Sequence, residues 1–383
     1  MNSILRPTEA VIHLRSLKKN FDWLRGLTSS HFFCPMVKAN AYGFGMVETA
    51  PHLVRWGAKY LGVATIEEGI ALRSVIPSDT QILCFTPFDR SGLQAILEYQ
   101  LTPVIMSKHE LQLVAELGHP VGVHIKFDTN MHRLGLSIDE LPKLDSWIKS
   151  HPQVQVLGVC SHLACAELMG AGEVDVDEQF RQFERIKSFL KDRNVGALHF
   201  YNSAALIAQA QLGDSMYPNS YGARVGISLY GAVSDFKLPQ VTNWGRQHIE
   251  LAMSLYSQVV LTREVKKGEF ISYGASWRAD RDSLIGVLPI GYADGLRRGL
   301  SNRLNVLVNE EHLCPLVGTI CMDYCFVDLT QCKGLIPARP KVLFFGGQGI
   351  KKLSIESLAL PLSTIPYEIM TGLSDRVHRV YEG

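Results

Sequence analysis

Over roughly the first 240 residues, short apolar runs alternate with longer stretches in which apolar residues recur at helical spacing. The apolar runs are rich in Val, Ile and aromatic residues, which favour β-strands. Three of the longer stretches show clear helical periodicity: TIEEGIALRSVI (65–76), SKHELQLVAELG (107–118) and DEQFRQFERIKSFLKDR (177–193). Strands that alternate with helices predict βαβ units and a parallel sheet.

Eight apolar runs make up this alternation, after a short strand and a helix near the N-terminus. The runs are FFCPMVK (32–38), KYLGVA (59–64), QILCF (81–85), TPVIM (102–106), VGVHIKFDT (121–129), VQVLGVCSHL (154–163), ALHFYNS (197–203) and ARVGISLYG (223–231). Eight strands within roughly 230 residues match a (β/α)₈ barrel better than an open sheet. We therefore predict an N-terminal TIM barrel over residues 9–240.

The pattern changes beyond residue 240. β-rich stretches such as 251–274 and 303–329 consist of short apolar runs divided by turn signals such as KKGE (266–269), and long helical patterns are missing. This predicts a mostly-β domain over residues 241–383, with residues 1–8 packed against it. The stretch YEIMTGLSDRVHRV (367–380) is an exception, because its amphipathic pattern predicts a helix. The fold class is thus α/β, a barrel followed by a β domain.

Composition narrows the range of partners. The chain has 383 residues, of which 46% are hydrophobic and 20% charged, and its 38 Lys and Arg nearly balance 37 Asp and Glu. The chain therefore has no excess of positive or negative charge that would suggest a nucleic acid or membrane partner. No apolar run approaches the ~18 residues of a membrane span. The first residues do not resemble a secretory signal. We expect a cytoplasmic protein.

The eight cysteines have irregular spacing. The sequence holds no C-x-x-C pair and no H-x-x-x-H pair, so neither a zinc site nor a disulfide framework is expected. Free thiols, most of them buried, are the simpler interpretation.

Polar residues fall repeatedly at the carboxyl ends of the predicted barrel strands. These residues are Lys38, Asp128, Arg133, His162, Asn202, Ser203, Arg224 and Gly226. In a barrel this rim is built from the βα loops and carries the catalytic groups. A set of polar strand ends on one rim therefore predicts an active site there.

Lys38 is the first of these residues. Its stem could simply pack while the ammonium reaches water. A lysine in an apolar setting near cationic side chains such as Arg133 and Arg224 instead loses its proton more easily, which permits Schiff-base chemistry. The backbone at Gly226 and Ile227 and the hydroxyl of Ser203 suit a phosphate. A Schiff-base lysine and a phosphate-binding site together indicate pyridoxal 5′-phosphate as the cofactor.

With these residues assembled, essentially the whole chain resembles the alanine racemases, fold-type III pyridoxal-phosphate enzymes. The matching segments are VKANAYGFG (37–45), KFDTNMHRLG (126–135), NSAALI (202–207), RVGISLYG (224–231), ISYGASW (271–277), GYADG (291–295), GTICMD (318–323) and IPYEIMTGLSDRVHR (365–379). Eight segments in the family's order are a specific match.

The resemblance implies a role for each barrel residue. Lys38 would hold the cofactor covalently, His162 would lie near its ring, and Arg224 would face the pyridine nitrogen. Arg133 would reach the ring oxygen and the substrate carboxylate. The resemblance also implies a phosphate-binding group: Tyr42, Asn202, Ser203, Gly226, Ile227 and Tyr367.

The resemblance further implies a homodimer with shared active sites. Tyr273 and the segment Cys321–Met322–Asp323 would come from the partner subunit, and Tyr292 would help to gate the entrance. Racemisation needs a base on each face of the α-carbon, and Lys38 and Tyr273 would be the two bases. The substrate would be a small amino acid, and the product D-alanine would serve peptidoglycan.

Several alternatives stay open. A racemase that accepts serine or a broader set of amino acids fits the same motifs, and so does a pyridoxal-phosphate-binding protein without turnover. A decarboxylase is disfavoured, because Arg224 is too weak an acid to protonate the pyridine nitrogen. Taken alone, Tyr273 could be a half-buried strand residue and His162 a core histidine.

Lys126 lies seven residues before Arg133, where many racemases carry a lysine carbamylated by carbon dioxide. We expect the same modification here. Four residues depart from the family pattern: Phe44 replaces a histidine, Asn130 a glycine, Thr319 a common arginine and His378 a proline. None of the four removes a proposed base.

Overall fold

The computed structural model describes residues 5–191, 195–348 and 351–383, and its contacts divide the chain into two compact units. The barrel unit comprises Lys18–Ala41 and Gly45–Glu250. The β unit comprises the N-terminal segment through Leu17, Tyr42–Phe44 and Leu251–Gly383. The predicted boundary at residue 240 falls inside helix α11 (Pro239–His248), and residues 9–13, predicted with the barrel, lie in the β unit.

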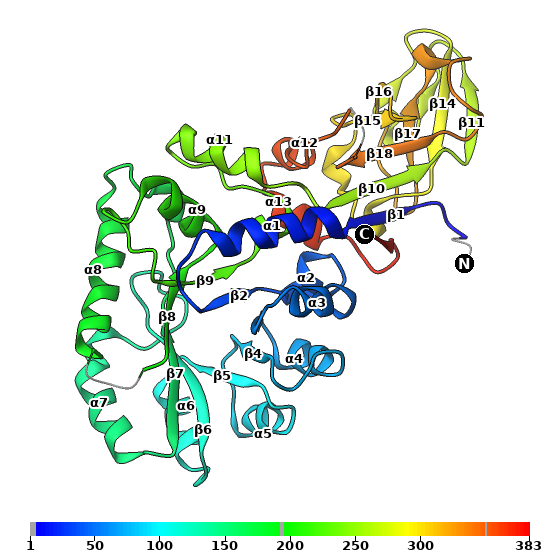
Figure 1. Ribbon diagram of the computed structural model, residues 1–383. Coiled ribbons are helices and arrows are strands. Elements are labelled where there is room, and N and C mark those ends of the chain that lie inside the picture. Colours follow the sequence, from blue (N-terminus) through cyan, green and yellow to red (C-terminus); the bar gives the residue numbers. More distant parts are fainter. Residues whose placement is uncertain (1–4, 192–194, 349–350) are drawn as a thin grey trace. The chain divides into compact units, whose positions relative to one another are not determined.

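The barrel unit contains a sheet of eight parallel strands, which confirms the predicted fold class (Figure 1). The strands are β2 (Phe33–Pro35), β3 (Tyr60–Val63), β4 (Gln81–Cys84), β5 (Thr102–Ile105), β6 (Val121–Lys126), β7 (Val154–Cys160), β8 (Ala197–Tyr201) and β9 (Gly222–Val225). They pair in chain order from β3 to β9, and β9 pairs with β2. The sheet closes where Val37 N–H donates to the Gly62 carbonyl at 2.8 Å.

Helices connect and surround these strands. They are α1 (Leu14–Gly26), α2 (Lys38–Tyr42), α3 (Met46–Arg55), α4 (Ile66–Arg73), α5 (Arg90–Glu98), α6 (Lys108–Ala115), α7 (Leu141–Ser150), α8 (Val174–Phe189), α9 (Ser203–Leu212), α10 (Ile227–Tyr230) and α11, with 3₁₀ turns at Ile138–Glu140 and Ala166–Leu168. All three predicted helical stretches are confirmed, although residues 192 and 193 lie outside the described part. Helices α4 and α6 begin at capping boxes, Thr65 with Glu68 and Ser107 with Glu110.

The β unit is built from mostly antiparallel strands and short turns; β1 and β19 are the parallel pair among its described strands. Its strands are β1 (Glu9–His13), β10 (Met253–Gln258), β11 (Leu261–Val265), β12 (Phe270–Ile271), β13 (Trp277–Arg278), β14 (Ser283–Leu288), β15 (Asn305–Val308), β16 (His312–Pro315), β17 (Cys325–Asp328), β18 (Lys341–Phe345) and β19 (His378–Glu382). The largest sheet has the order β16-β15-β18-β10-β1-β19, and β11-β14-β17 form a second sheet. The predicted mostly-β character is confirmed.

The helix predicted over residues 367–380 is wrong in its second half. Helix α13 covers only Pro366–Thr371, and the chain then turns and enters β19, which pairs in parallel with β1. The partner that converts this amphipathic stretch into a strand lies more than 360 residues away in the sequence. Local periodicity cannot register such a partner.

Three further observations concern membrane-spanning helices, metal-ligand clusters and cysteines. No helix within the described ranges is long and apolar enough to cross a membrane. In the same residues no cluster of three or more His, Cys, Asp or Glu side chains is arranged to hold a metal ion. The eight cysteines are free thiols, six of them buried and two, Cys165 and Cys321, half-buried.

Candidate active site

Lys38 stands directly after β2, at the start of a left-handed turn. Residues 39–41 have φ angles of 52°, 52° and 53° although none of them is glycine. Left-handed conformations cost L-residues about 1–2 kcal/mol each, and such strain persists only where the surroundings hold it. Two contacts hold it here: the N–H of residue 39 donates to Glu68 Oε1 at 2.6 Å, and Met46 N–H donates to Asn40 Oδ1 at 2.7 Å. The lysine therefore sits on a strained, braced turn.

The environment of Lys38 favours its neutral amine. Burial lowers the pKa of Lys38, the positive charges of Arg133 and Arg224 lower it further, and the carboxylate of Glu68 opposes them. Glu68 thus braces the turn and limits the fall in the pKa. A half-buried lysine with a lowered pKa is a stronger nucleophile and base than an exposed one.

Arg224, in β9, is a buried cation with only neutral partners. Its Nη1 donates to His199 Nδ1 at 2.8 Å and to the His199 carbonyl at 2.7 Å. Its Nη2 donates to the Ser161 carbonyl at 2.6 Å and to His162 Nδ1 at 3.2 Å. In the part of the chain that the structure describes, no carboxylate appears among the groups that act on the Arg224 pKa. A buried guanidinium in such surroundings is suited to donate a hydrogen bond to an acceptor atom of a bound ligand.

These contacts assign the histidine tautomers. Arginine has no acceptor atom, so the Nδ1 atoms of His162 and His199 accept and their protons sit on Nε2. Burial, aided by the charge of Arg224, lowers the pKa of both histidines well below 6.5. Both rings are therefore neutral at pH 7. His162 is thus a neutral neighbour of Arg224, as well as a residue of the barrel rim.

The chain of hydrogen bonds continues to a third histidine that the sequence analysis missed. His199 Nε2 lies 2.8 Å from His124 Nδ1, so His199 donates and His124 accepts. The remaining N–H of His124, on Nε2, is buried without a partner among the described residues. His124 and His199 lie inside β6 and β8, two residues before each strand ends. A polar residue within an otherwise apolar strand was the signal that could have found them.

These neutral histidines predict acid sensitivity. Burial lowers the pKa of His124 to about 3. Between pH 6.5 and that value the unfolded chain binds a proton on His124 that the folded chain does not, so lowering the pH favours unfolding. We expect the urea midpoint to fall between pH 7.5 and 5.5, and to fall less in His124→Gln. Equal pH dependence in both proteins would show that His124 titrates normally.

On another side of the barrel rim, α9 and α10 begin close together. The Gly226 N–H, at the start of α10, donates to the buried Ser203 Oγ at 2.9 Å. Asn202 caps α9 by accepting from Ala205 N–H at 2.9 Å, and its Nδ2 donates to the Leu163 carbonyl. The structure therefore gives Asn202 a structural role at this point. The first turn of α9 also carries backbone N–H groups without helical acceptors, which favour an anion.

Lys126 ends β6 and is buried, and its ammonium donates to the Leu134 carbonyl. Burial is the largest cause that lowers the pKa of Lys126. Arg133, seven residues further on, is exposed. It follows a turn held by Asp128, whose Oδ1 accepts from the N–H groups of residues 131 and 132 at 3.0 Å. Asn130 in this turn has a φ of 76°, a conformation that asparagine tolerates better than most non-glycine residues.

The β unit brings a second set of predicted residues together. Tyr273 begins a 3₁₀ turn (Tyr273–Ala275) and is 73% exposed, so the alternative of a half-buried strand tyrosine is wrong. Thr319 holds this turn: its Oγ1 donates to the Tyr273 carbonyl at 2.8 Å, and its own carbonyl accepts from Ser272 Oγ at 2.6 Å. The departure from the family's arginine thus leaves a residue that braces the turn.

Tyr292 and the segment Cys321–Asp323 join this set. The N–H groups of Tyr292 and Ala293 donate to the carbonyls of Cys321 and Met322, each at 3.0 Å. Cys321 Sγ lies 3.3 Å from Ser272 Oγ, beside the Tyr273 turn. Met322 is 52% and Tyr292 41% exposed. Three segments far apart in sequence therefore form one bonded group that presents aromatic and sulfur side chains to its surroundings.

Tyr42 and Tyr367 also lie together in the β unit, with ring centroids 6.2 Å apart. Between Tyr42 and Phe44, Gly43 has a φ of 87°, and a β-carbon there would lie 2.2 Å from the Met370 carbonyl oxygen, so only glycine fits. Phe44 is fully buried, and its carbonyl accepts from Tyr381 Oη at 2.8 Å. The departure at Phe44 is thus accounted for as a core side chain of this unit.

Two family models match the chain. The model described as the alanine racemase N-terminal domain matches residues 12–234, and that described as the alanine racemase C-terminal domain matches residues 252–381. An alanine racemase of Helicobacter pylori (strain P12) is 33% identical over 98% of this chain and 99% of its own length. One of Clostridium novyi (strain NT) is 34% identical over 98% of this chain and 96% of its own.

Solved structures show the same similarity. An alanine racemase of Clostridium difficile 630 superposes with a TM-score of 0.87 at 28% identity, over 99% of this chain and 97% of its own. The alanine racemase of Bartonella henselae, solved with covalently bound pyridoxal phosphate, superposes with a TM-score of 0.83 at 29% identity, over 98% of this chain and 99% of its own.

Proposed function

The chain belongs to the alanine racemase family and is an amino-acid racemase; from this premise we propose that it interconverts L- and D-alanine with pyridoxal 5′-phosphate and two bases, Lys38 and Tyr273. The observation that carries the proposal is Lys38 on its strained turn, with a pKa lowered by burial and by the charges of Arg133 and Arg224. That turn prepares an amine for covalent attachment and for proton transfer.

The barrel residues fit this cofactor. Lys38 would hold it covalently, and the Ser203 hydroxyl and the backbone N–H groups of Ser203 and Ile227, at the starts of α9 and α10, would donate to its phosphate. Asn202 would support these donors by capping α9, and Gly226 by its bond to Ser203 Oγ. The family resemblance adds the hydroxyls of Tyr42 and Tyr367 for the phosphate, His162 near the ring, and Arg133 for the ring oxygen and the substrate carboxylate. Pyridoxal phosphate, when bound, supplies an electron sink for negative charge on the substrate α-carbon.

Arg224 limits which reaction this site favours. The buried guanidinium donates hydrogen bonds but cannot give up its proton, so it would hold the pyridine nitrogen of the bound cofactor without protonating it. An unprotonated pyridine ring withdraws electrons less strongly than a protonated one. This would favour rapid return of a proton to the α-carbon over slower side reactions. His199 and His162 support this state, because their neutral rings accept from Arg224 and keep its donors oriented. His124 accepts in turn from His199 and so holds that ring.

The two bases act on opposite faces of the α-carbon. Lys38 Nζ holds or returns the proton on one face, and the Tyr273 hydroxyl does so on the other. We propose that Tyr273, Tyr292 and Cys321–Asp323 serve the barrel of a second subunit, so that a homodimer shares its sites. The exposure of Tyr273, Met322 and Tyr292 on one bonded group supports a covering partner.

Lys126 is proposed to carry a carbamate that orients Arg133. A buried amine with a lowered pKa is neutral more often and so reacts more readily with carbon dioxide, and the carbamate nitrogen keeps an N–H for the Leu134 carbonyl. We expect the native mass, measured in bicarbonate, to exceed the mass of the chain with its lysine-bound cofactor by one carbon dioxide per chain, and Lys126→Ala to lose this increment. An active enzyme with an unmodified Lys126 contradicts the proposal.

Thr319 is expected to matter through the Tyr273 turn. Thr319→Val keeps the shape of the side chain but removes its hydrogen bond to the Tyr273 carbonyl. One lost hydrogen bond is worth about 0.5–1.5 kcal/mol, so kcat/KM for alanine should fall by up to about tenfold. Thr319→Ser keeps the hydroxyl and should stay close to wild type. Equal loss in both variants would point to packing instead.

One experiment tests the function as a whole. The purified protein should show the visible absorption of a lysine-bound pyridoxal cofactor, and borohydride should abolish it. Loss of optical activity is then followed with L-alanine and with L-serine. A colourless protein without a borohydride-sensitive lysine contradicts the cofactor proposal. A coloured protein that is inert with both amino acids supports the binding-protein alternative. A faster reaction with L-serine than with L-alanine would show that serine is the preferred substrate.

The proposal extends to the role of the product. D-alanine made by this enzyme would supply peptidoglycan, and the enzyme would act in the cytoplasm, where it meets free amino acids. Growth that depends on added D-alanine after loss of the gene is the expected result. Growth without it would show that another source supplies the cell wall.

A further inference from the structure

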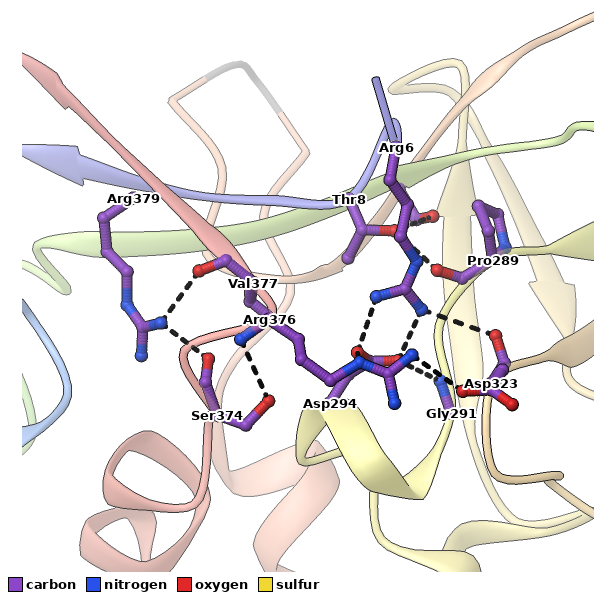
Figure 2. A network of polar contacts seen from close by, with 11 residues as sticks. Arg6, Thr8, Pro289, Gly291, Asp294, Asp323, Ser374, Arg376, Val377 and Arg379 are labelled. Carbon is purple, nitrogen blue, oxygen red and sulfur yellow. Dashed lines mark hydrogen bonds and ion pairs between the residues drawn. The ribbon is translucent and has the colours of Figure 1, made fainter. Parts of the chain in front are cut away.

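Asp294 is a fully buried carboxylate in the β unit, within the turn that carries Tyr292. Figure 2 shows the side chains that converge on it. Arg6 donates to both carboxylate oxygens, each at 2.6 Å, and Gly291 N–H donates to Oδ2 at 2.8 Å. Arg376 Nε lies 3.3 Å from Oδ1. A buried charge requires such partners, because removal from water is costly.

The turn around Asp294 fits closely against Cys321 and Met322. A β-carbon on Gly291 would lie 2.3 Å from the carbonyl oxygens of both, so only glycine permits the approach. The carboxylate of Asp294 closes the turn by accepting from Gly291 N–H, and the turn then donates its next two N–H groups to those same carbonyls. The position of Tyr292 and that of Met322 therefore depend on one carboxylate.

The two arginines extend this control to Asp323. Arg376 Nη2 donates to Asp323 Oδ1 at 2.7 Å while its Nε faces Asp294. Arg6 Nη2 also reaches the Asp323 carbonyl, at 3.5 Å. Arg376 thus bridges a buried and a half-exposed carboxylate. The segment Cys321–Asp323 is tied to Asp294 at its carbonyls and at its last side chain.

We infer that Asp294 is a positioning residue for the site of the partner subunit. Through Arg6 and Arg376 it sets Tyr292 against Cys321–Asp323, the group that the proposed function assigns to the barrel of the second copy. The inference rests on that proposed function, because it adds a buried determinant of the geometry of the shared site. An amide cannot replace the carboxylate, since it offers one acceptor oxygen to several donors and turns its NH₂ toward an arginine.

Asp294→Asn is expected to lower kcat/KM for alanine by about 10²-fold, the size of a misplaced substrate contact, with the cofactor absorption retained. Arg376→Gln leaves Asp294 paired with Arg6 and should cost about tenfold, mainly in KM, and Arg376→Lys should recover part of this loss. Asp282→Asn is the matched control, because that exposed carboxylate pairs with Lys266 elsewhere in the β unit. If Arg376→Gln and Asp294→Asn both keep wild-type kinetics, the inference is wrong.

Mixed dimers separate a role in the partner's site from a role within the subunit. A dimer with one Asp294→Asn chain and one Lys38→Ala chain is isolated with two affinity tags. If Asp294 serves the partner, one of its two sites combines intact Lys38 with intact Asp294, and the dimer should show half of wild-type activity. A dimer of Tyr273→Phe with Lys38→Ala is the reference for site sharing.

Three outcomes are distinguishable. Recovery in both mixed dimers supports the inference. Recovery only in the Tyr273 reference dimer overturns it and leaves the proposed function intact, because Asp294 would then act inside its own subunit. Recovery in neither mixed dimer contradicts the sharing of sites and overturns the inference with it. If Asp294→Asn does not fold, Arg376→Gln takes its place in the mixed dimer, since it leaves no buried carboxylate unpaired.

Discussion

Tyr273→Phe is expected to slow racemisation of L-alanine and of D-alanine equally, by about 10²–10⁴-fold, the usual contribution of one general base. The hydroxyl that serves one face of the α-carbon is lost, while Lys38 still serves the other. The two enantiomers have equal free energy in water, so the ratio of kcat/KM in the two directions stays at one. Polarimetry from each enantiomer measures this loss.

Exchange of the α-hydrogen in deuterium oxide distinguishes the two bases. Lys38 alone can remove and return a proton on its own face without inverting the substrate. In Tyr273→Phe we therefore expect only one of the two enantiomers, the one whose α-hydrogen faces Lys38, to exchange that hydrogen, as followed by proton NMR. Tyr99→Phe, at an exposed tyrosine of the barrel unit, is the control and should leave both rates unchanged. Rapid exchange of both enantiomers in Tyr273→Phe would refute the assignment of Tyr273 as a base.

Lys38→Ala is expected to lose both the borohydride-sensitive absorption and at least about 10⁴-fold of the racemase activity, because one side chain holds the cofactor and acts as a base. The phosphate donors around Ser203 and Gly226 remain, so the variant should still bind the cofactor weakly and release it on gel filtration. Absorption spectra before and after filtration, together with polarimetry, provide the measurement.

Lys59→Ala is the matched control for Lys38→Ala. Lys59 is an exposed lysine of the same unit, directly before β3, and its removal should change neither absorption nor rate. A Lys38→Ala variant that keeps colour resistant to gel filtration would show that another lysine holds the cofactor. The strained turn after Lys38 would then need a different explanation.

Much of the barrel could be predicted because its determinants are local. The runs that became β4 (Gln81–Cys84) and β5 (Thr102–Ile105) are short, apolar and bounded by polar residues, and the intervening stretches carry helical periodicity and capping signals. In a barrel, the residues at the carboxyl end of each strand lie on one rim, so the predicted end of a strand also predicts which side chains lie on that rim. Lys38, His162 and Arg224 could therefore be assigned to one rim without a structure.

What could not be predicted depends on partners far apart in the chain. The stretch 367–380 has a helical pattern, yet its second half pairs with β1 near the N-terminus. Tyr273 lies in a sequence that reads as a strand, yet Thr319 holds it in an exposed turn. His124 and His199 are apart by 75 residues and share one hydrogen bond.

The sequence by itself determined the strand and helix alternation, the family, and the residue types at the barrel rim, because periodicity and ordered motifs are properties of neighbouring residues. Only the tertiary structure decided that Arg6 meets Asp294 across 288 positions, that Arg224 has neutral partners, and that Asn202 caps a helix. These facts depend on burial, because a charge or an N–H removed from water must find a partner wherever the fold brings one.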